Sequence, residues 1–362
     1  MRLLNDTIDN IVKKECNKKI IFFGCGSWFE IVNYTAFMQL ESRFAYIVDN
    51  EAVGERKIGE KLLPVYRCEK LFEETEAIII LTSPIYMYDM YCQLQKMNLP
   101  NSIVCYAFPF VQMISKQEVD SVMNDHSMVK DKIPKIIHSF WFSGEQKPYA
   151  YQKCVESWSH ILHDYEIIEW NKDNYDWHKH PFVERAIELG AWAYASDYAR
   201  LDVLDTNGGI YLDMDVEVFK PFDDLLKNKM ILSFANNVYV DLAVIGAEKN
   251  NALIKKMLSL YDGVELPNRK QEFSRFFQPF WVRKTLVECG IKMNGAMQMI
   301  DGACVFPSEF FMPMDAILYR DYNRTENTYC VHYDNFGWSF GKDNKKEKKK
   351  HDNELLWNNI GL

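Results

Sequence analysis

The sequence predicts an α/β protein with two domains, and three observations support this. The chain has 362 residues, more than one domain usually holds. Its first hundred residues alternate strand-like apolar runs with helical segments, and a second such series begins near residue 133. Between them, residues 116–132 are polar and weakly periodic. We therefore expect domains at residues 1–115 and 133–340, a linker at 116–132 and a basic, amphipathic tail at 341–362.

The first domain contains apolar runs that are typical of the buried strands of a parallel sheet. These runs are residues 19–24, 44–48, 77–81 and 102–106. Helical segments separate them, and residues 1–18 have the pattern of a short amphipathic helix. The alternation predicts a small sheet of the Rossmann type.

Part of a dinucleotide-binding fingerprint follows the first of these runs. Gly24, Gly26 and Asp49 stand where the pattern requires two glycines and an acidic residue. Phe29 occupies the third glycine position, where its bulk prevents close packing of helix on strand. An NAD-binding oxidoreductase or a sensor acting through this domain is therefore an alternative and not the main prediction.

Composition excludes some partners and suggests a compartment. The 42 basic and 51 acidic residues give a net charge of −9, which argues against a general nucleic-acid binder. The nine cysteines form no CxxC pair, so we expect reduced thiols. The charged N-terminus and the lack of a long apolar run predict a cytoplasmic protein. Lysines at 345–350 precede an apolar end, which would allow peripheral contact with the inner membrane face.

The most informative stretch is residues 191–219. A helical pattern ends at Gly208 and Gly209, and strict alternation of apolar and polar residues then predicts a strand over 210–218. Asp213 and Asp215 would share one face of this strand. Two adjacent carboxylates repel each other unless a cation screens them, and Mg²⁺ or Mn²⁺ prefers such oxygen ligands. The alternative is a solvated acidic face.

The whole stretch resembles a known signature. The positions that carry the resemblance are Ser196, Asp197, Arg200, Gly208, Gly209, Tyr211, Asp213 and Asp215, in the pattern S-D-x-x-R and then G-G-x-Y-x-D-x-D. This pattern resembles the DXD sugar-binding region of the family 32 glycosyltransferases, which include yeast mannosyltransferases and bacterial capsule enzymes. The resemblance implies a GT-A-type nucleotide-sugar-binding domain, preceded here by the Rossmann-like module.

Two further blocks resemble the same family. Residues 133–141 match its opening strand, and Trp141 would stack on the nucleotide base, unless it is a core tryptophan. Residues 330–339 resemble its last motif, in which His332 would complete the metal or diphosphate shell and Ser339 would contact the donor. A lone histidine on a strand is otherwise more often structural.

The resemblance implies a role for each matched residue. The metal ligands would be Asp213, Asp215 and His332, and Asp213, Asp215 and Arg200 would be catalytic. The donor-binding residues would be Trp141, Asp197, Arg200, Gly209, Tyr211, Asp213, His332 and Ser339. From the residues alone, the pair Asp197 and Arg200 could equally be an exposed ion pair.

The predicted function is metal-dependent glycosyl transfer, with Mn²⁺ or Mg²⁺ as cofactor. The donor would be a UDP- or GDP-sugar, and the acceptor a glycan or lipid-linked oligosaccharide in bacterial capsule or exopolysaccharide synthesis. The family implies retention of anomeric configuration. A nucleotide-sugar hydrolase or phosphotransferase using the same DXD motif is a further alternative.

Overall fold

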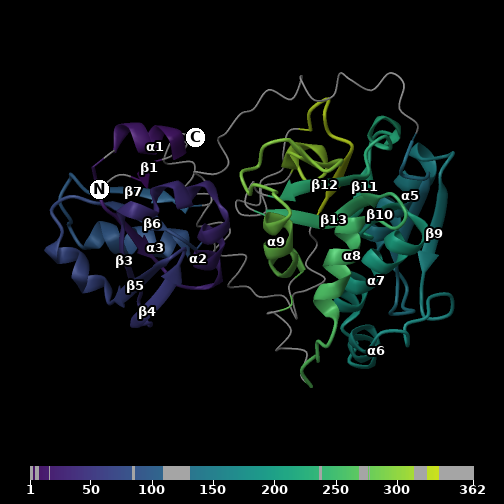
Figure 1. The fold of residues 1–362 in the computed structure, drawn as a ribbon, viewed down its shortest axis with the longest axis horizontal. Helices are drawn as coiled ribbons and strands as arrows, with labels where there is room; N and C mark the ends of the chain where they lie inside the picture. Colours follow the sequence, from purple (N-terminus) through teal and green to yellow (C-terminus); the bar gives the residue numbers. More distant parts are fainter. Residues whose placement is uncertain are drawn as a thin grey trace.

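The computed structural model describes residues 3–4, 8–15, 17–83, 86–108, 131–235, 239–268, 276, 278–313 and 324–333. Two separate seven-stranded sheets are flanked by helices, so the predicted α/β class is confirmed (Figure 1). We call the part around the first sheet the first unit and the part around the second sheet the second unit. Most of the predicted linker and the whole predicted tail lie outside the described residues, so the domain limits stay a prediction.

The first sheet has the strand order β1-β7-β6-β2-β3-β5-β4. Its strands are β1 (Leu3–Leu4), β2 (Ile20–Phe23), β3 (Phe44–Val48), β4 (Gly54–Ile58), β5 (Lys61–Tyr66), β6 (Ile78–Leu81) and β7 (Val104–Ala107). All neighbours are parallel except β4 and β5. The four predicted strands correspond to β2, β3, β6 and β7. The edge strand β4 is mostly exposed and so has no apolar run that would reveal it.

Helical segments connect these strands. They are α1 (Ile8–Lys14), α2 (Ser27–Ile31), η1 (Val32–Tyr34), η2 (Ala36–Arg43), η3 (Cys68–Glu73) and α3 (Met87–Lys96). The helix predicted after β2 is broken into α2 and two 3₁₀ segments. Phe29, at the third glycine position of the fingerprint, is buried with its ring edge-on to Phe22 at 5.2 Å. The Asp49 carboxylate accepts hydrogen bonds from the backbone N–H groups of Cys25, Glu51 and Ala52. Its oxygens thus bind the loops around it.

The second sheet is mixed, with the order β14-β15-β12-β13-β10-β8-β9. Its strands are β8 (Ile136–Phe140), β9 (Glu166–Trp170), β10 (Gly209–Leu212), β12 (Met230–Ala235), β13 (Tyr239–Ala247), β14 (Gln298–Ile300) and β15 (Ala303–Phe306). β10 lies between β8, which is parallel to it, and β13, which is antiparallel. A separate antiparallel pair joins β11 (Val216–Val218) to β16 (Cys330–His332).

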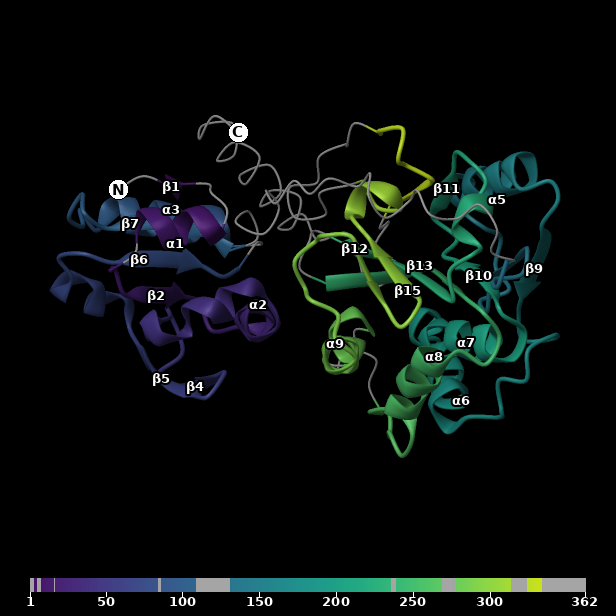
Figure 2. The ribbon, with the colours of Figure 1, turned by 45° about the horizontal axis from the view of Figure 1, so that its top comes forward.

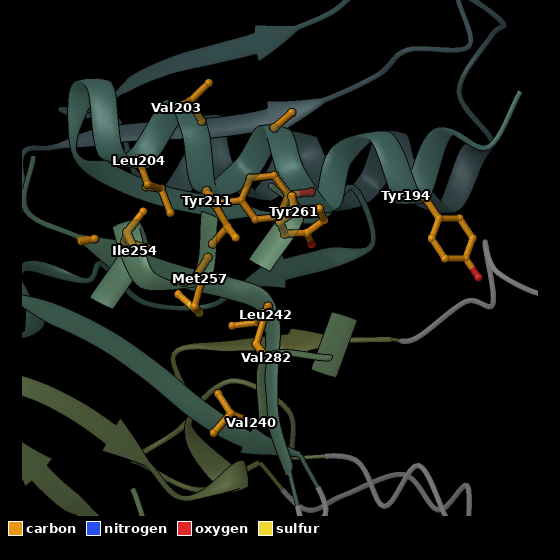
Figure 3. Close-up of a cluster of buried hydrophobic side chains, with 14 of the residues drawn as sticks. Tyr194, Val203, Leu204, Tyr211, Val240, Leu242, Ile254, Met257, Tyr261 and Val282 are labelled. Carbon is orange, nitrogen blue, oxygen red and sulfur yellow. The ribbon is translucent and has the colours of Figure 1, made fainter. Parts of the chain in front are cut away.

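The helices of the second unit surround this sheet. They are α5 (Tyr149–Ile161), α6 (Pro181–Glu188), α7 (Trp192–Asn207), α8 (Ala252–Leu258) and α9 (Gln278–Glu288), with short 3₁₀ segments η4 (Asp223–Leu225), η5 (Ser259–Tyr261) and η7 (Ser308–Phe310). In the core, Leu204 of α7 and Ile254 of α8 pack in one apolar cluster with Tyr211 of β10 and Leu242 of β13 (Figure 3). This cluster holds α7 against β10, the two elements that carry the predicted motif.

The two units share an apolar cluster. Phe37 and Phe108 of the first unit belong to it, together with Ala235, Tyr239 and Met312 of the second. A parallel β-bridge also joins Thr35 to Met293. Both views place α2 on the side of the first unit that faces α9 and β13 (Figures 1 and 2).

A buried histidine links three parts of the second unit. His138 on β8 is fully buried, and its Nε2 lies 2.8 Å from the carbonyl oxygen of Gly208. Trp170 Nε1 donates to His138 Nδ1 at 3.1 Å, so the neutral ring donates through Nε2 and accepts through Nδ1. Burial lowers the pKa of His138 below its usual value.

We predict that His138 makes the protein less stable in mild acid. Below the unfolded pKa of about 6.5, the unfolded chain gains a proton that the folded protein excludes, so the free energy of unfolding falls by up to about 1.4 kcal/mol per pH unit. Urea titrations between pH 7 and pH 5 should show a shallower loss for His138→Gln than for the parent. His160 is exposed, so His160→Gln serves as the control. Its free energy of unfolding should fall with pH as steeply as that of the parent. Equal slopes for all three proteins would contradict this role for His138.

Candidate functional site

The DXD residues form a turn and do not lie on one strand. β10 ends at Leu212, and the N–H of Val216 donates to the carbonyl oxygen of Asp213 to close the turn. The chain then leaves the main sheet as β11 and pairs with β16. The prediction of a continuous alternating strand over residues 210–218 was therefore wrong, because β11 pairs with a distant segment instead of extending β10. This change of partner places Val216 opposite His332.

The turn and β16 bring three candidate metal ligands together. One side-chain ligand atom from each of Asp213, Asp215 and His332 lies within 4.8 Å of the other two. His332 Nε2 is 3.5 Å from Asp215 Oδ1, and His332 Nδ1 is 2.9 Å from Asp241 Oδ2 on β13. Burial acts to raise the pKa of Asp241, but the neighbouring imidazole outweighs it and the pKa lies below its usual value. Asp241 thus orients the ring, as carboxylates commonly do for metal-binding histidines.

These residues fit a divalent cation. Two carboxylates and an imidazole form a donor set that Mn²⁺ accepts readily, and Mg²⁺ uses the carboxylate oxygens with water and phosphate. All three side chains are at least three-quarters buried, with exposed fractions of 23%, 12% and 10% for Asp213, Asp215 and His332. Burial raises the pKa of Asp213, and the adjacent charge of Arg200 opposes this effect. A cation would further stabilise its ionised form.

Arg200 connects α7 to the DXD turn. Its guanidinium is 3% exposed, and Nη2 lies 3.0 Å from Asp197 Oδ1 and 3.3 Å from Asp213 Oδ1. Nη1 donates to the carbonyl oxygen of Leu242 at 2.8 Å, and the group lies 4.5 Å from the centre of the Tyr211 ring. The alternative of an exposed ion pair was therefore wrong. Most of the N–H groups of Arg200 therefore contact other groups of the protein.

Tyr211 and Gly209 act mainly on the local structure. The Tyr211 hydroxyl donates to Asp213, so it helps to fix the first carboxylate of the turn. Gly209 has a φ of +116°, and a Cβ there would lie 2.6 Å from the carbonyl oxygen of Ile136. Glycine at this position lets β10 approach β8. Ser339 lies outside the described residues, so its predicted donor contact stays a prediction.

An outer compartment of about 300 Å³ opens in front of the turn. It is lined by Phe140, Trp141, Phe142, Ser143, Pro148, Tyr151, Trp192, Ala193, Ser196, Arg200, Tyr211, Asp213, Met214, Asp215 and His332. Trp141 is half-buried there and packs against an apolar cluster of the second unit. Its Nε1 donates to the carbonyl oxygen of Glu145 at 2.7 Å, and its ring is edge-on to Tyr151. The volume and aromatic lining are typical of a small-molecule site.

A smaller inner compartment of about 40 Å³ lies behind the turn. It is lined by Asp197, Arg200, Asp213, Tyr239, Asp241, Leu242, Gln278, Pro279, Met312 and His332. Arg200, Asp213 and His332 border both compartments. Among the described residues, the Asp197 carboxylate and Gln278 Oε1 have buried oxygens without a hydrogen-bond donor, although Asp197 keeps its ion pair with Arg200. Burial raises the pKa of Asp197, and Arg200 opposes this. Such oxygens are suited to accept ligand hydroxyl groups.

The sequence did not reveal every residue of this site. Tyr151 lies on α5 and Gln278 on α9, and the first residues of these helices match none of the motifs described above. Asp241 of β13 also belongs to this site, where it lies beside His332 and orients the imidazole ring.

Comparisons with known proteins now bear on this geometry. Residues 148–232 match the family model "Glycosyltransferase sugar-binding region containing DXD motif". Over these residues the chain is similar to the DXD-containing glycosyltransferase family. The match begins just before α5 and ends within β12, so it includes α7, the DXD turn and two thirds of the residues that line the outer compartment. It confirms the predicted family, and the mixed sheet of the second unit agrees with the GT-A-type domain expected for it.

Two curated relatives share this region. An uncharacterized glycosyltransferase of Acanthamoeba polyphaga mimivirus is 34% identical over 100 residues, which cover 26% of this chain and 40% of that protein. Inositol phosphoceramide mannosyltransferase 1 of Schizosaccharomyces pombe is 31% identical over 107 residues, which cover 26% of this chain and 32% of that protein. The aligned part therefore spans less than half of either relative.

Solved structures of glycosyltransferases also resemble the chain. The galactosyltransferase LgtC, solved with donor and acceptor sugar analogues, is 18% identical with a TM-score of 0.31, covering 62% of this chain and 95% of its own. A glycosyltransferase involved in glycosylation of the major capsid of the virus PBCV-1 is 15% identical with a TM-score of 0.33. The match covers 60% of this chain and 98% of that chain.

We predict that Arg200→Ala destabilises the whole protein. The substitution leaves two buried carboxylates without their cation, which should lower the free energy of unfolding by about 3–5 kcal/mol. Arg185→Ala is the matched control, because Arg185 also pairs with an acidic residue three positions away, Glu188, but at the surface. Arg185→Ala should lower the free energy of unfolding by less than about 1 kcal/mol. Urea-induced unfolding followed by circular dichroism measures the free energy of unfolding of both variants. Similar decreases for the two would show that the ion pairs of Arg200 are not central to stability.

Proposed function

We propose that the protein is a metal-dependent glycosyltransferase that uses a nucleotide-sugar donor. The observation that carries the proposal is that two compartments meet at the candidate metal ligands: Asp213 and His332 line both, and Asp215 lines the outer one. The outer compartment is aromatic, and the inner one is polar. A nucleotide sugar has the same order of parts: an aromatic base, a charged diphosphate and a sugar rich in hydroxyl groups.

The outer compartment would hold the nucleoside. Trp141 presents an indole that Lys147 approaches to 5.8 Å on one side and Tyr151 contacts edge-on. Stacking on an indole stabilises any base, so this contact fixes the position of the nucleoside without choosing it. UDP- and GDP-sugars are the donors that we propose.

The diphosphate would lie at the DXD turn. Asp213, Asp215 and His332 would hold a divalent cation there, which would supply positive charge to the leaving diphosphate. The chain itself contributes the rigid geometry: Tyr211 and Arg200 fix Asp213, and Asp241 fixes His332. A preorganised site of this kind stabilises charge without reorganising during the reaction.

The inner compartment would hold the donor sugar. The buried oxygens of Asp197 and Gln278 can accept hydrogen bonds from sugar hydroxyls. Because an unpaired buried acceptor is costly, a sugar that lacks the matching hydroxyl would bind less well. This arrangement supports glycosyl transfer, and retention of configuration follows the family resemblance.

The acceptor that we propose is a glycan or a lipid-linked oligosaccharide, as in capsule or exopolysaccharide synthesis. Among the described residues, no helix combines the length and apolar character needed to cross a membrane. A cytoplasmic location, with the lysines at 345–350 near the inner membrane face, remains part of the proposal; those lysines lie outside the described residues. Product analysis separates transfer from nucleotide-sugar hydrolysis, since hydrolysis would release free sugar even when acceptor is present.

The central test is Asp215→Asn. The substitution keeps the size of the side chain but removes a charged ligand, so affinity for UDP or GDP with Mn²⁺ should fall by more than about 100-fold. Isothermal titration calorimetry measures this, and EDTA should abolish binding to the parent protein. Glu217→Gln, two residues further along β11, is the control, because Glu217 bonds Tyr333 and lies outside the ligand cluster. Unchanged, EDTA-resistant binding to Asp215→Asn would remove the metal from the proposal.

A second test addresses the nucleoside. Trp141→Ala should weaken binding of UDP and GDP by roughly one to two orders of magnitude, because base stacking on an aromatic side chain is lost. Trp141→Phe should retain most of the affinity. Trp177→Ala removes another partly buried indole that does not line either compartment, and should have no effect. Equal affinities for Trp141→Ala and the parent would place the base elsewhere.

A further inference from the structure

We propose that the first unit is a working part of the donor site, and that Trp28 is a positioning residue for the inner compartment. Trp28 lies on α2, outside the family-matched region. It acts through Tyr239, which lines the inner compartment. This inference rests on the proposed function, because it assigns the inner compartment to the donor sugar.

The direct link is an aromatic contact between the units. The rings of Trp28 and Tyr239 are 6.5 Å apart and meet edge-on at 69°. Tyr239 is the first residue of β13, two residues before Asp241, which orients His332. Trp28 thus supports the end of the strand that carries part of the site. Edge-on aromatic pairs of this kind favour one relative placement of the two rings.

Two other walls of the inner compartment also depend on the first unit. Met312 lines the compartment and belongs to the apolar cluster shared with Phe37 and Phe108. The helix α9 starts with Gln278 and Pro279, which line the compartment, and it packs against η1. The β-bridge from Thr35 to Met293 fixes the chain shortly after α9. Three separate wall segments are therefore held from outside the second unit.

The size of the inner compartment makes this support important. Its volume of about 40 Å³ has room for roughly three water molecules. A hexosyl group is several times larger, so at least one wall must shift when a donor sugar enters. Buried ion pairs join Arg200 to Asp197 and Asp213, so moving these residues apart would have a large energetic cost. The adjustment therefore falls on Tyr239, Met312 and the start of α9, the walls that the first unit holds.

The outer compartment gives a contrast. All of its lining residues lie between positions 140 and 332, and none belongs to the first unit. Loosening the contact of Trp28 should therefore alter how the sugar is bound and leave the nucleoside diphosphate unaffected. A general loss of folding would weaken both.

The experiment compares two affinities in the full-length protein with Mn²⁺. Isothermal titration calorimetry gives dissociation constants for UDP and UDP-glucose, and for GDP and GDP-mannose. For Trp28→Ala, we expect the constant for the sugar nucleotide to rise roughly three- to tenfold, the range that one aromatic pair supports, while the constant for the matching diphosphate stays the same. Tyr66→Ala is the matched control, since it removes a similar edge-on ring contact, to Tyr46, within the first unit.

Further variants keep the test decisive. Trp28→Phe retains a ring and should restore parental sugar binding. If Trp28→Ala does not fold, as judged by thermal unfolding, Trp28→Leu fills the apolar space without the ring and should show the same selective loss. In a Tyr239→Leu background, Trp28→Leu should cause no further change, because its effect passes through Tyr239.

Three results would overturn the inference. They are unchanged sugar binding in the folded Trp28 variants, an equal loss for diphosphate and sugar nucleotide, and a full additional effect in the Tyr239→Leu background. If the parent protein binds each diphosphate and its sugar nucleotide with equal affinity, the inner compartment is not the sugar site. The inference then fails, while the proposed nucleotide site stands. If the parent binds no nucleotide at all, the proposed function fails first and the inference with it.

Discussion

The site depends on one buried guanidinium. Arg200 lies between Asp197 on its own helix and Asp213 on the turn after β10. Two buried carboxylates would otherwise repel each other, and the energetic cost of burying the three charges is offset only because the geometry is tight. The arginine also binds a carbonyl oxygen of β13. It therefore fixes α7, the DXD turn and β13 relative to one another, and these elements carry most of the proposed donor contacts.

The second organising feature is the change of strand partner at the turn. If β10 had continued through residue 218, both aspartates would have pointed from one face of the main sheet, with no histidine beside them. Instead β11 pairs with β16, a segment more than a hundred residues away, and His332 comes to lie opposite Val216. Asp241 then completes the group from β13. Three distant segments thus supply the three candidate ligands and the carboxylate that orients one of them.

The sequence predicted the parts of this site that are encoded locally. Asp213, Asp215, Asp197 and Arg200 lie within twenty residues of each other. The spacing of the two DXD aspartates suggested a metal, and the resemblance to the DXD family suggested a sugar. Four strands of the first sheet were equally clear, because buried parallel strands are continuous apolar runs. The turn at Asp213 was not predictable, because alternation over residues 210–218 suits a strand whether or not its partner changes. Gln278 was missed for a similar reason, since its role arises only when α9 meets α7.

The same distinction applies to the relation between the two units. The sequence treats the first unit as a module with its own fingerprint, yet Phe29 fills the third glycine position and Asp49 binds its own loops. The helix that follows this loop instead presents Trp28 to Tyr239. A surface that would serve a ligand in an isolated Rossmann-type domain here supports the wall of a neighbouring site. Because the walls formed by Arg200 and its partners are rigid, the first unit is the part of the molecule best placed to govern how the inner compartment adapts to a sugar.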